Sequence, residues 1–259
     1  METLQVKRSP RIMGLMINRP EQQNSINATL IDDFHRALDR AEADPECRLV
    51  VLEGANGVFC TGMDFAEVAA EAAAANHEGM RSAKYIELID RFTSVPKVVV
   101  AKIDGRVTAG GVGLVAASDL VVASPRSQFS LSEALWGLLP CCVLPYLIRR
   151  IGFQPAYRMT LTTQAVSAQE ALAFHLVDEV ANDLDDAIRR WMLRVGRLEE
   201  ETLRELKQYF RQMWKISAET EEFAVSEITR LVSKPKVIRN ISNFVALKQF
   251  PWEHTSGER

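Results

Sequence analysis

Short apolar runs alternate with helical patterns along the first half of the chain, and this alternation is the feature that most constrains the fold. The apolar runs occupy residues 11–17, 49–54 and 97–103, and stretches of helical periodicity lie between them. Short apolar runs bounded by turn residues are typical of buried strands, so the alternation predicts an α/β fold. The first helix is expected from about Asn27, a plausible N-cap, to the turn at Pro45, with its apolar stripe on a sheet.

The pattern becomes wholly helical in the last part of the chain. From about Asp183, apolar residues recur at helical spacing, and a second such stripe follows from Leu203. Ser167 and Glu170 have the spacing of a capping box at the start of a further helix. Neither an internal repeat nor a Pro/Ser linker separates the two halves. We therefore expect a core over residues 1–195 that continues into a helical region over residues 196–259.

Composition and charge exclude several classes of protein. The 259 residues are 47% hydrophobic with a formal charge of -3, which excludes extensive disorder and gives no overall attraction to nucleic acid or an anionic membrane. A signal-peptide apolar stretch and a run of about 18 apolar residues are both missing from the sequence, so neither secretion nor membrane insertion is favoured. The four cysteines show no CxxC spacing and no two histidines lie at ligand spacing, which argues against disulfides and a metal site and favours a reducing, cytoplasmic setting.

Two glycine-containing loops are the candidate functional features. They span residues 56–65 (NGVFCTGMDF) and 104–114 (DGRVTAGGVGL), and each follows an apolar strand and precedes a helical stretch. Such a loop exposes free backbone N–H groups that can bind an anion or a developing oxyanion. The sequence AGGVG is not GxGxxG, and neither loop is followed by the lysine and hydroxyl residue of a P-loop, so a nucleotide site is not favoured. Glycines that only turn the chain remain an alternative.

Five blocks of the sequence resemble the crotonase (enoyl-CoA hydratase/isomerase) superfamily. In order, over roughly residues 10–185, they are MINRPEQQNSIN, GVFCTGMDF, IDGRVTAGGVGLVAASDLVVAS, FSLSEALWGLLP and LTTQAVSAQEALAFHLVDEV. The resemblance implies a spiral of ββα units followed by a C-terminal helical assembly region, and a homotrimer or hexamer. It also implies a thioester substrate whose carbonyl oxygen accepts hydrogen bonds from two backbone amides, those of Met63 and Gly110.

The acid–base groups depart from the hydratase pattern. The resemblance implies two glutamates, but the first position is occupied here by Gly113, and only the second, Glu133, is a carboxylate. One carboxylate can both remove the proton next to the carbonyl and return it to a departing hydroxyl, particularly with a pKa near neutral. The alternative for Glu133 is an acid placed at the start of a helix, near its dipole.

A stretch of about 45 residues carries a narrower likeness. AGGVGLVAASD and LSEALWGLLPCCVLPYLIRRIGF are similar to the dehydratases of polyketide β-branching cassettes. This likeness implies loss of water from a 3-hydroxy-3-methylglutaryl group on an acyl carrier protein, giving a 3-methylglutaconyl thioester. No cofactor is implied beyond the phosphopantetheine, or CoA, that carries the substrate. The alternatives are the sister decarboxylase, a hydratase or isomerase of acyl-CoA catabolism, and a non-catalytic scaffold, which the glycine at position 113 would permit.

Other side chains are candidates for substrate contact. Cys60 and Gly111 lie in the two loops, and Asp64 either orients its loop or caps the following helix. Lys84 and Tyr85 follow the Ala-rich stretch 66–79, which is expected to form either a helix that closes over the pocket or an exposed connecting helix. They could meet a distal carboxylate of the substrate, or belong to a solvated helix face.

Basic and sulfur-containing side chains complete the candidates. Cys141 and Cys142 are expected to be buried, inert thiols. Near the C-terminus, positive charges interleave with apolar residues at helical spacing, which fits either an acidic carrier-protein partner or a plain amphipathic helix. These are Lys234, Lys236, Arg239 and Lys248. Arg149, Arg150 and Arg158 could contact a phosphate or cap a helix end.

Overall fold

Ten strands form two sheets in the computed structural model, which describes residues 1–73, 79–214 and 216–253. The larger sheet has the order β1-β2-β3-β5-β7-β10, and the smaller has the order β4-β6-β8-β9. The larger sheet comprises β1 (Leu4–Ser9), β2 (Ile12–Ile17), β3 (Leu49–Gly54), β5 (Val98–Ile103), β7 (Leu120–Ala123) and β10 (Glu179–Val180). The smaller comprises β4 (Val58–Cys60), β6 (Arg106–Thr108), β8 (Gln128–Ser130) and β9 (Val166–Ser167).

Successive strands enter the two sheets alternately, and this is what makes the fold a spiral. The chain passes from β3 to β4, from β5 to β6 and from β7 to β8, so each pair contributes one strand to each sheet. Within each sheet these strands pair in parallel, whereas β1–β2 and β8–β9 are antiparallel. The α/β class and the spiral of ββα units expected from the sequence are therefore confirmed.

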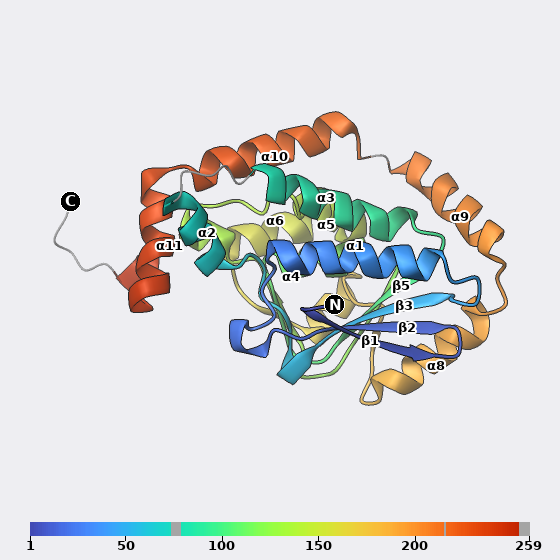
Figure 1. Cartoon of the computed structure of the whole chain (residues 1–259). Helices are drawn as coiled ribbons and strands as arrows, with labels where there is room; N and C mark the ends of the chain where they lie inside the picture. Colours follow the sequence, from blue (N-terminus) through green and yellow to red (C-terminus); the bar gives the residue numbers. More distant parts are fainter. Residues whose placement is uncertain (74–78, 215, 254–259) are drawn as a thin grey trace.

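Most helices lie above the larger sheet in the view of Figure 1, whereas α8 (Leu184–Val195) lies below it and packs on its opposite face. The first group is α1 (Ala28–Glu42), α2 (Phe65–Ala73), α3 (Gly79–Ser94), α4 (Gly110–Ala117), α5 (Leu144–Ile151), α6 (Phe153–Thr162) and α7 (Ala168–Ala173). The C-terminal group is α8 (Leu184–Val195), α9 (Glu200–Met213), α10 (Ala218–Val232) and α11 (Pro235–Leu247). Four short 3-10 turns are η1 (Pro20–Gln22), η2 (Ala55–Gly57), η3 (Glu133–Trp136) and η4 (Pro251–Glu253).

The capping signals in the sequence act as expected. The Asn27 side chain accepts a hydrogen bond from the Leu30 amide at the start of α1, and the Ser167–Glu170 capping box opens α7. Both bonds satisfy amides that the first helical turn leaves without an intrahelical acceptor. The apolar face of α1, including Leu30 and Phe34, is fully buried in the main core, as its spacing predicts.

Parts of the two predicted loops are strands. Residues 58–60 form β4 and residues 106–108 form β6, so the glycine loops are shorter than expected and follow the smaller sheet. Strands of three residues have no periodicity of their own, and they form here because parallel partners complete their hydrogen bonds. The sequence also gave no indication of β1, which pairs along its whole length with β2.

The C-terminal helices fold back over the rest of the chain. α10 lies along α3, and α11 stands against α2 and η3 (Figure 1). The boundary at residue 195 stays a prediction. The predicted helix over 66–79 corresponds to α2 and the start of α3, and residues 74–78 between them lie outside the described part of the chain. Within the described ranges, no helix combines the length and apolar character needed to cross a bilayer.

Candidate active site

The carboxyl ends of β4, β6 and β8 lie side by side, and the chain segments that follow these strands form the candidate site. Thr108, the last residue of β6, pairs with Ser130, the last residue of β8. The Ala109 amide donates to the Ser130 carbonyl at 3.0 Å, and the Thr108 hydroxyl donates to the Thr61 carbonyl at 3.1 Å. Ligand sites in parallel sheets commonly occupy this edge. The three segments carry Met63, Gly110 and Glu133.

The two glycine loops touch. Gly62 has a positive φ of 83°, and a Cβ on it would lie 2.9 Å from the Gly110 nitrogen. Met63 and Ile26 form an isolated parallel β-bridge. In this bridge the Ile26 amide donates to the Gly62 carbonyl, and the Asp64 amide donates to the Ile26 carbonyl. Met63's own amide therefore points away from Ile26. Neither this amide nor that of Gly110 has a hydrogen-bond acceptor among the residues described, so the structure brings two available donors together.

Glu133 is the first residue of η3 and supplies the acidic group. Its Oε2 is buried and has no hydrogen-bond partner within the described part of the chain. Burial raises the pKa of Glu133 to about 7, and backbone hydrogen bonds at Glu133 and Ser132 offset only part of that rise. At neutral pH the carboxyl group is therefore close to equally protonated and ionised, as suits a group that both takes and returns a proton.

Five aromatic rings enclose the segment that carries Glu133. Trp136, in the same turn, packs on Phe65 of α2 and Phe244 of α11, with ring centroids 4.7 and 5.1 Å away. Phe250 and Trp252 extend this cluster. Because these rings come from α2, η3, α11 and the residues after α11, the C-terminal helix of the chain packs against the turn that carries Glu133. This cluster is not predictable from the sequence, since no local pattern indicates that Trp136 and Phe244 meet.

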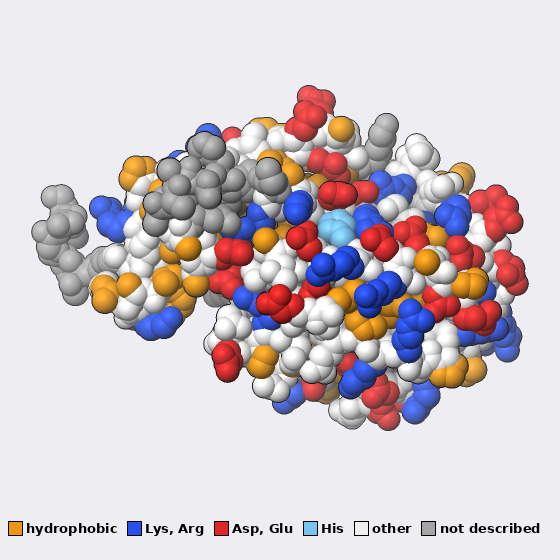
Figure 2. Space-filling view, viewed as in Figure 1, with side chains coloured by type: hydrophobic (Ala, Val, Ile, Leu, Met, Phe, Trp, Pro, Cys, Tyr) orange, Lys and Arg blue, Asp and Glu red, His pale blue; other side chains and the backbone are white. Residues whose placement is uncertain are grey.

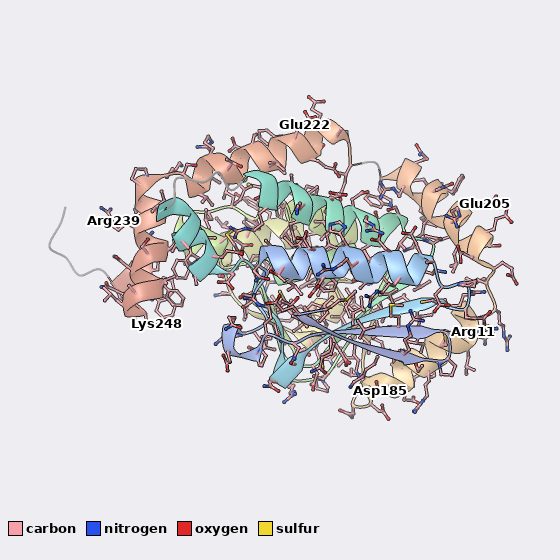
Figure 3. The ribbon with its side chains drawn as sticks, viewed as in Figure 1. Arg11, Asp185, Glu205, Glu222, Arg239 and Lys248 are labelled. Carbon is pink, nitrogen blue, oxygen red and sulfur yellow. The ribbon has the colours of Figure 1, made fainter. Side chains whose placement is uncertain are left out.

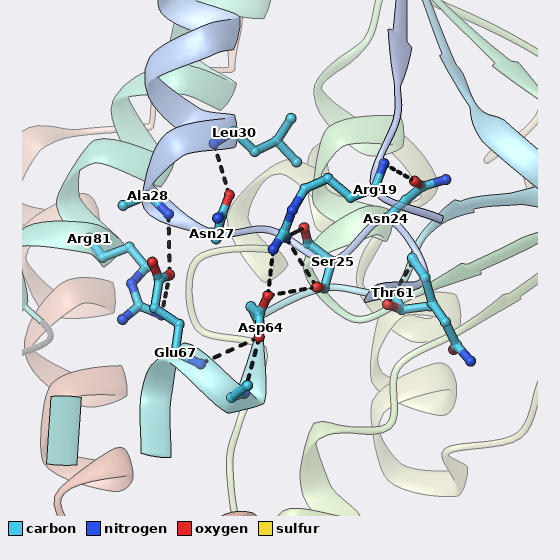
Figure 4. A network of polar contacts seen from close by, with 12 residues as sticks. Arg19, Asn24, Ser25, Asn27, Ala28, Leu30, Thr61, Asp64, Glu67 and Arg81 are labelled. Atoms are coloured by element: carbon cyan, nitrogen blue, oxygen red, sulfur yellow. Dashed lines mark hydrogen bonds and ion pairs between the residues drawn. The ribbon is translucent and has the colours of Figure 1, made fainter. Parts of the chain in front are cut away.

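A buried ion pair holds the Met63 loop in place (Figure 4). The Arg19 guanidinium donates to Asp64 Oδ2 at 2.8 Å, and the Ser25 hydroxyl donates to the same oxygen at 3.1 Å. Asp64 Oδ1 accepts hydrogen bonds from the backbone amides of Ala66 and Glu67 at the start of α2. Burial would raise the pKa of Asp64, but the bonds from Arg19, Ser25 and the Glu67 amide outweigh it and keep the pKa below its usual range. Asp64 therefore combines the two roles considered for it, orienting the loop and capping the helix. Arg19 was not recognised from the sequence.

Of the remaining candidates, Tyr85 and Cys60 lie at the glycine loops, whereas Lys84 does not. Tyr85 is buried and its hydroxyl donates to the Gly110 carbonyl at 2.5 Å, so it is not on a solvated face. Lys84 is half-exposed and pairs with Asp32 of α1 at 3.0 Å, so the structure does not bring it to the loops. Cys60 is buried under Gly111, and burial raises the pKa of its thiol to about 12, which keeps the thiol protonated.

Of the three arginines after the apolar block, Arg149 and Arg150 cap a helix, whereas Arg158 is exposed and pairs with Glu170 at 3.7 Å. Arg149 donates to the Ala116 carbonyl and Arg150 to the Ser118 carbonyl, at the end of α4. They therefore complete a helix terminus, one of the two alternatives from the sequence. Across the described ranges, no three His, Cys, Asp or Glu side chains lie together in a way that could hold a metal ion.

Two adjacent amide donors beside one buried carboxyl group define a class of chemistry. The amides can stabilise negative charge on a carbonyl oxygen, and the carboxyl group can move a proton at a nearby carbon. A fold of alternating ββα units with such a site is typical of enzymes that add or remove water at acyl thioesters.

The family comparisons agree with this class. Residues 7–255 match the family described as enoyl-CoA hydratase/isomerase, and the chain belongs to this family. It is 35% identical to the bacillaene synthase dehydratase PksH of Bacillus subtilis, over 97% of each chain. A crystal structure of a putative polyketide biosynthesis enoyl-CoA hydratase (pksH) from Bacillus subtilis superimposes with a TM-score of 0.89 at 34% identity, covering 96% of this chain and 99% of that one. An enoyl-CoA hydratase from Mycobacterium avium superimposes with a TM-score of 0.84 at 28% identity, covering 97% and 98%. The protein is therefore an enzyme of the hydratase/dehydratase type.

Proposed function

We propose that the protein is a dehydratase that removes water from a β-hydroxy acyl thioester. The observation that carries this proposal is the single carboxyl group, Glu133, whose pKa burial raises to about 7 beside the two loop amides. In the proposed reaction the amides of Met63 and Gly110 bind the thioester oxygen. The ionised Glu133 takes the proton from C2, and the electron pair of that bond moves into the thioester as an enolate.

The second step returns the proton. The enolate collapses to a C2–C3 double bond, the C3–O bond breaks, and the protonated Glu133 delivers its proton to the departing hydroxyl. One water leaves, and the carboxylate is regenerated. A general acid–base group contributes about 100- to 10,000-fold to such a rate, and the loss of one oxyanion donor costs about 100- to 1000-fold.

We propose as the substrate a 3-hydroxy-3-methylglutaryl group on the phosphopantetheine of an acyl carrier protein, with 3-methylglutaconyl thioester as the product. Support comes from the full-length similarity to a protein named as the bacillaene synthase dehydratase. Ionised Glu133 also supports proton removal, because decarboxylation would generate the enolate without a base at C2. Four cysteines without disulfides support a cytoplasmic setting for the reaction.

The exposed basic side chains of the C-terminal segment support an acidic carrier protein as partner. Lys234, Lys236, Arg239 and Lys248 are exposed, and Figure 3 shows Arg239 and Lys248 directed away from the body of the molecule at α11. This helix packs against the turn that carries Glu133, so a carrier bound there would deliver its arm close to Glu133. Elsewhere, the face in Figure 2 intersperses charges of both signs.

Exposed apolar side chains support assembly into a trimer or hexamer. Leu206, Tyr209, Phe210 and Met213 all lie on α9 and are each about half exposed or more. Clusters of this kind mark interaction surfaces, and we propose that α9 contacts a second copy of the chain.

Intact-protein mass spectrometry of the loaded carrier tests the proposed reaction. The enzyme is incubated with an acyl carrier protein bearing 3-hydroxy-3-methylglutaryl, beside a parallel assay on a short enoyl-CoA. Loss of one water from the carrier, with slow turnover of the CoA thioester, is the expected result. Loss of carbon dioxide would instead indicate a decarboxylase. Rapid hydration of the CoA thioester would indicate a catabolic hydratase, and no reaction in either assay would indicate a non-catalytic scaffold.

Charge reversal tests the carrier surface. The double variant Lys236→Glu/Arg239→Glu should raise KM for the carrier-bound substrate about tenfold or more and leave turnover of a pantetheine thioester unchanged, because only the carrier contacts α11. The control Lys7→Glu/Arg40→Glu makes the same charge change on exposed residues of β1 and α1. Equal effects of the two double variants would show that only overall charge matters.

A further inference from the structure

The Tyr85 hydroxyl fills the space above Gly113. A Cβ on Gly113 would lie 2.2 Å from the Tyr85 Oη and 3.1 Å from a methyl group of Val143. The first of these distances is shorter than any non-bonded contact that a protein sustains, so a side chain at position 113 and the observed position of Tyr85 exclude each other. Gly113 stands where the family pattern has a glutamate, and the Tyr85 hydroxyl lies over it in place of that carboxylate.

The surroundings hold Tyr85 in this position. It lies on α3 and is buried, and its hydroxyl donates to the Gly110 carbonyl at 2.5 Å. Burial raises the pKa of Tyr85 well above its usual range, with nearby groups that include Glu133 adding to the effect, so the hydroxyl stays neutral at physiological pH. Tyr85 binds Gly110 just after β6, and Glu133 follows β8, the strand paired with β6, so the two side chains belong to neighbouring segments of the site.

The bond to Gly110 restricts what the hydroxyl can do. A tyrosine has one proton to donate, and here the Gly110 carbonyl accepts it. The oxygen can still accept a hydrogen bond. The Tyr85 oxygen therefore suits a ligand group that donates a hydrogen bond and lies beside the loop amides and Glu133.

We propose that Tyr85 binds the β-hydroxyl group of the substrate, accepting its hydrogen bond while the substrate oxygen remains free to take the proton from Glu133. This inference rests on the proposed dehydration and assigns the hydroxyl-binding residue of that site. Tyr85 fixes the direction of the C3–O bond, and the same phenol excludes a second carboxylate at position 113.

Tyr85→Phe removes the oxygen alone and keeps the ring. On carrier-bound 3-hydroxy-3-methylglutaryl, kcat/KM should fall about 10- to 100-fold, the usual cost of losing a hydrogen bond to a buried polar group. A second reaction reports on Glu133 and the loop amides alone. Exchange of the C2 proton of carrier-bound 3-methylglutaryl in deuterium oxide needs Glu133 and the amides but offers no β-hydroxyl. This exchange should stay within about twofold of the parent rate in Tyr85→Phe and be lost in Glu133→Gln.

Tyr146→Phe is the matched control, because Tyr146 is also buried but its hydroxyl faces Asp90 and Glu221. It should leave both reactions near the parent rates. Equal losses of dehydration and exchange in Tyr85→Phe would overturn the inference, since Tyr85 would then act only by supporting the Gly110 loop. A parent enzyme that exchanges the C2 proton but never releases water would instead overturn the proposed function, and the role of Tyr85 with it.

The contact with Gly113 provides a second, geometric test. Gly113→Ala should impair exchange and lower the melting temperature, because its methyl group overlaps the Tyr85 hydroxyl and forces the whole ring, and with it the Gly110 loop, to shift. Combining it with Tyr85→Phe should recover part of both losses, since the nearest ring carbon is 3.3 Å from the Cβ position. Gly14→Ala, whose Cβ would have no neighbour within 3.5 Å, is the control substitution. Additive losses in the double variant would contradict the observed packing of Tyr85.

Discussion

The Glu133 carboxyl group is kept buried at a cost in stability. Its Oε2 has no hydrogen-bond partner among the residues described, and an acid in such a place favours its neutral form. The pKa is about 7 in the folded protein against an ordinary 4.5. Between these two values the folded state binds more protons than the unfolded state, so stability falls as pH rises.

Glu133→Gln should therefore stabilise the protein at pH 8 but not at pH 4.5. The full shift corresponds to about 3 kcal/mol, and because the amide introduced by Glu133→Gln is also polar and buried we expect a gain of about 1–2 kcal/mol at pH 8. Urea unfolding at both pH values measures it, with the exposed Glu205→Gln as control. A gain of the same size at both pH values would show that ionisation of Glu133 is not its cause.

At the scale of elements, the loop before α2 depends on the pair of Arg19 and Asp64. Both side chains are about one-tenth exposed, and Asp64 also caps α2 and accepts the Ser25 hydroxyl. Removing one partner of a buried ion pair leaves the other charge without compensation. The loop that carries the Met63 amide should then lose its position.

Asp64→Asn should cost about 1–3 kcal/mol of unfolding free energy and reduce kcat. A double-mutant cycle with Arg19→Met should give a coupling energy of about 1–3 kcal/mol. The cycle is repeated on Arg126 and Asp104, an exposed pair, which should couple by less than about 1 kcal/mol. Equal coupling energies in the two pairs would mean that burial does not strengthen the interaction between Arg19 and Asp64.

The elements that the sequence predicts are those whose signals are local. β3 coincides with the apolar run 49–54, and α1 begins directly after its cap, Asn27. The strands β4 and β6 lie in segments for which the sequence predicts loops, because three residues carry no periodicity and need partners from distant segments. The site follows the same division. The glycine loops and Glu133 carry a motif, whereas the burial of Tyr85 and the meeting of Trp136 with Phe244 depend on how α3 and α11 pack.

At the scale of the whole molecule, α9 packs on the rest of the chain through one face and leaves apolar side chains exposed on the other. Its inner face packs through Leu203 and Lys207, and the latter is buried with hydrogen bonds to the carbonyls of Phe92 and Lys97. Its outer face carries the exposed apolar residues of the proposed contact between copies.

Phe210→Glu/Met213→Glu should convert the assembly into monomers, because charges there cannot be buried without partners. Light scattering coupled to gel filtration measures the mass. Phe153→Glu/Tyr157→Glu on α6, another exposed apolar pair, is the control. A parent protein that is monomeric at micromolar concentration would contradict the proposed contact.

The pH dependence of single-turnover dehydration tests the central claim that one buried carboxyl group performs both proton transfers. With the enzyme in excess over loaded carrier, the rate should rise about tenfold per pH unit below pH 7 and level off above it, because the reaction begins with ionised Glu133. Glu133→Gln should lose about 100- to 10,000-fold at pH 8, where the parent rate is maximal, and should not show the rise in rate with pH. A rate that is flat from pH 5.5 to 8.5 in the parent enzyme, or a Glu133→Gln variant that dehydrates at the parent rate, would contradict it.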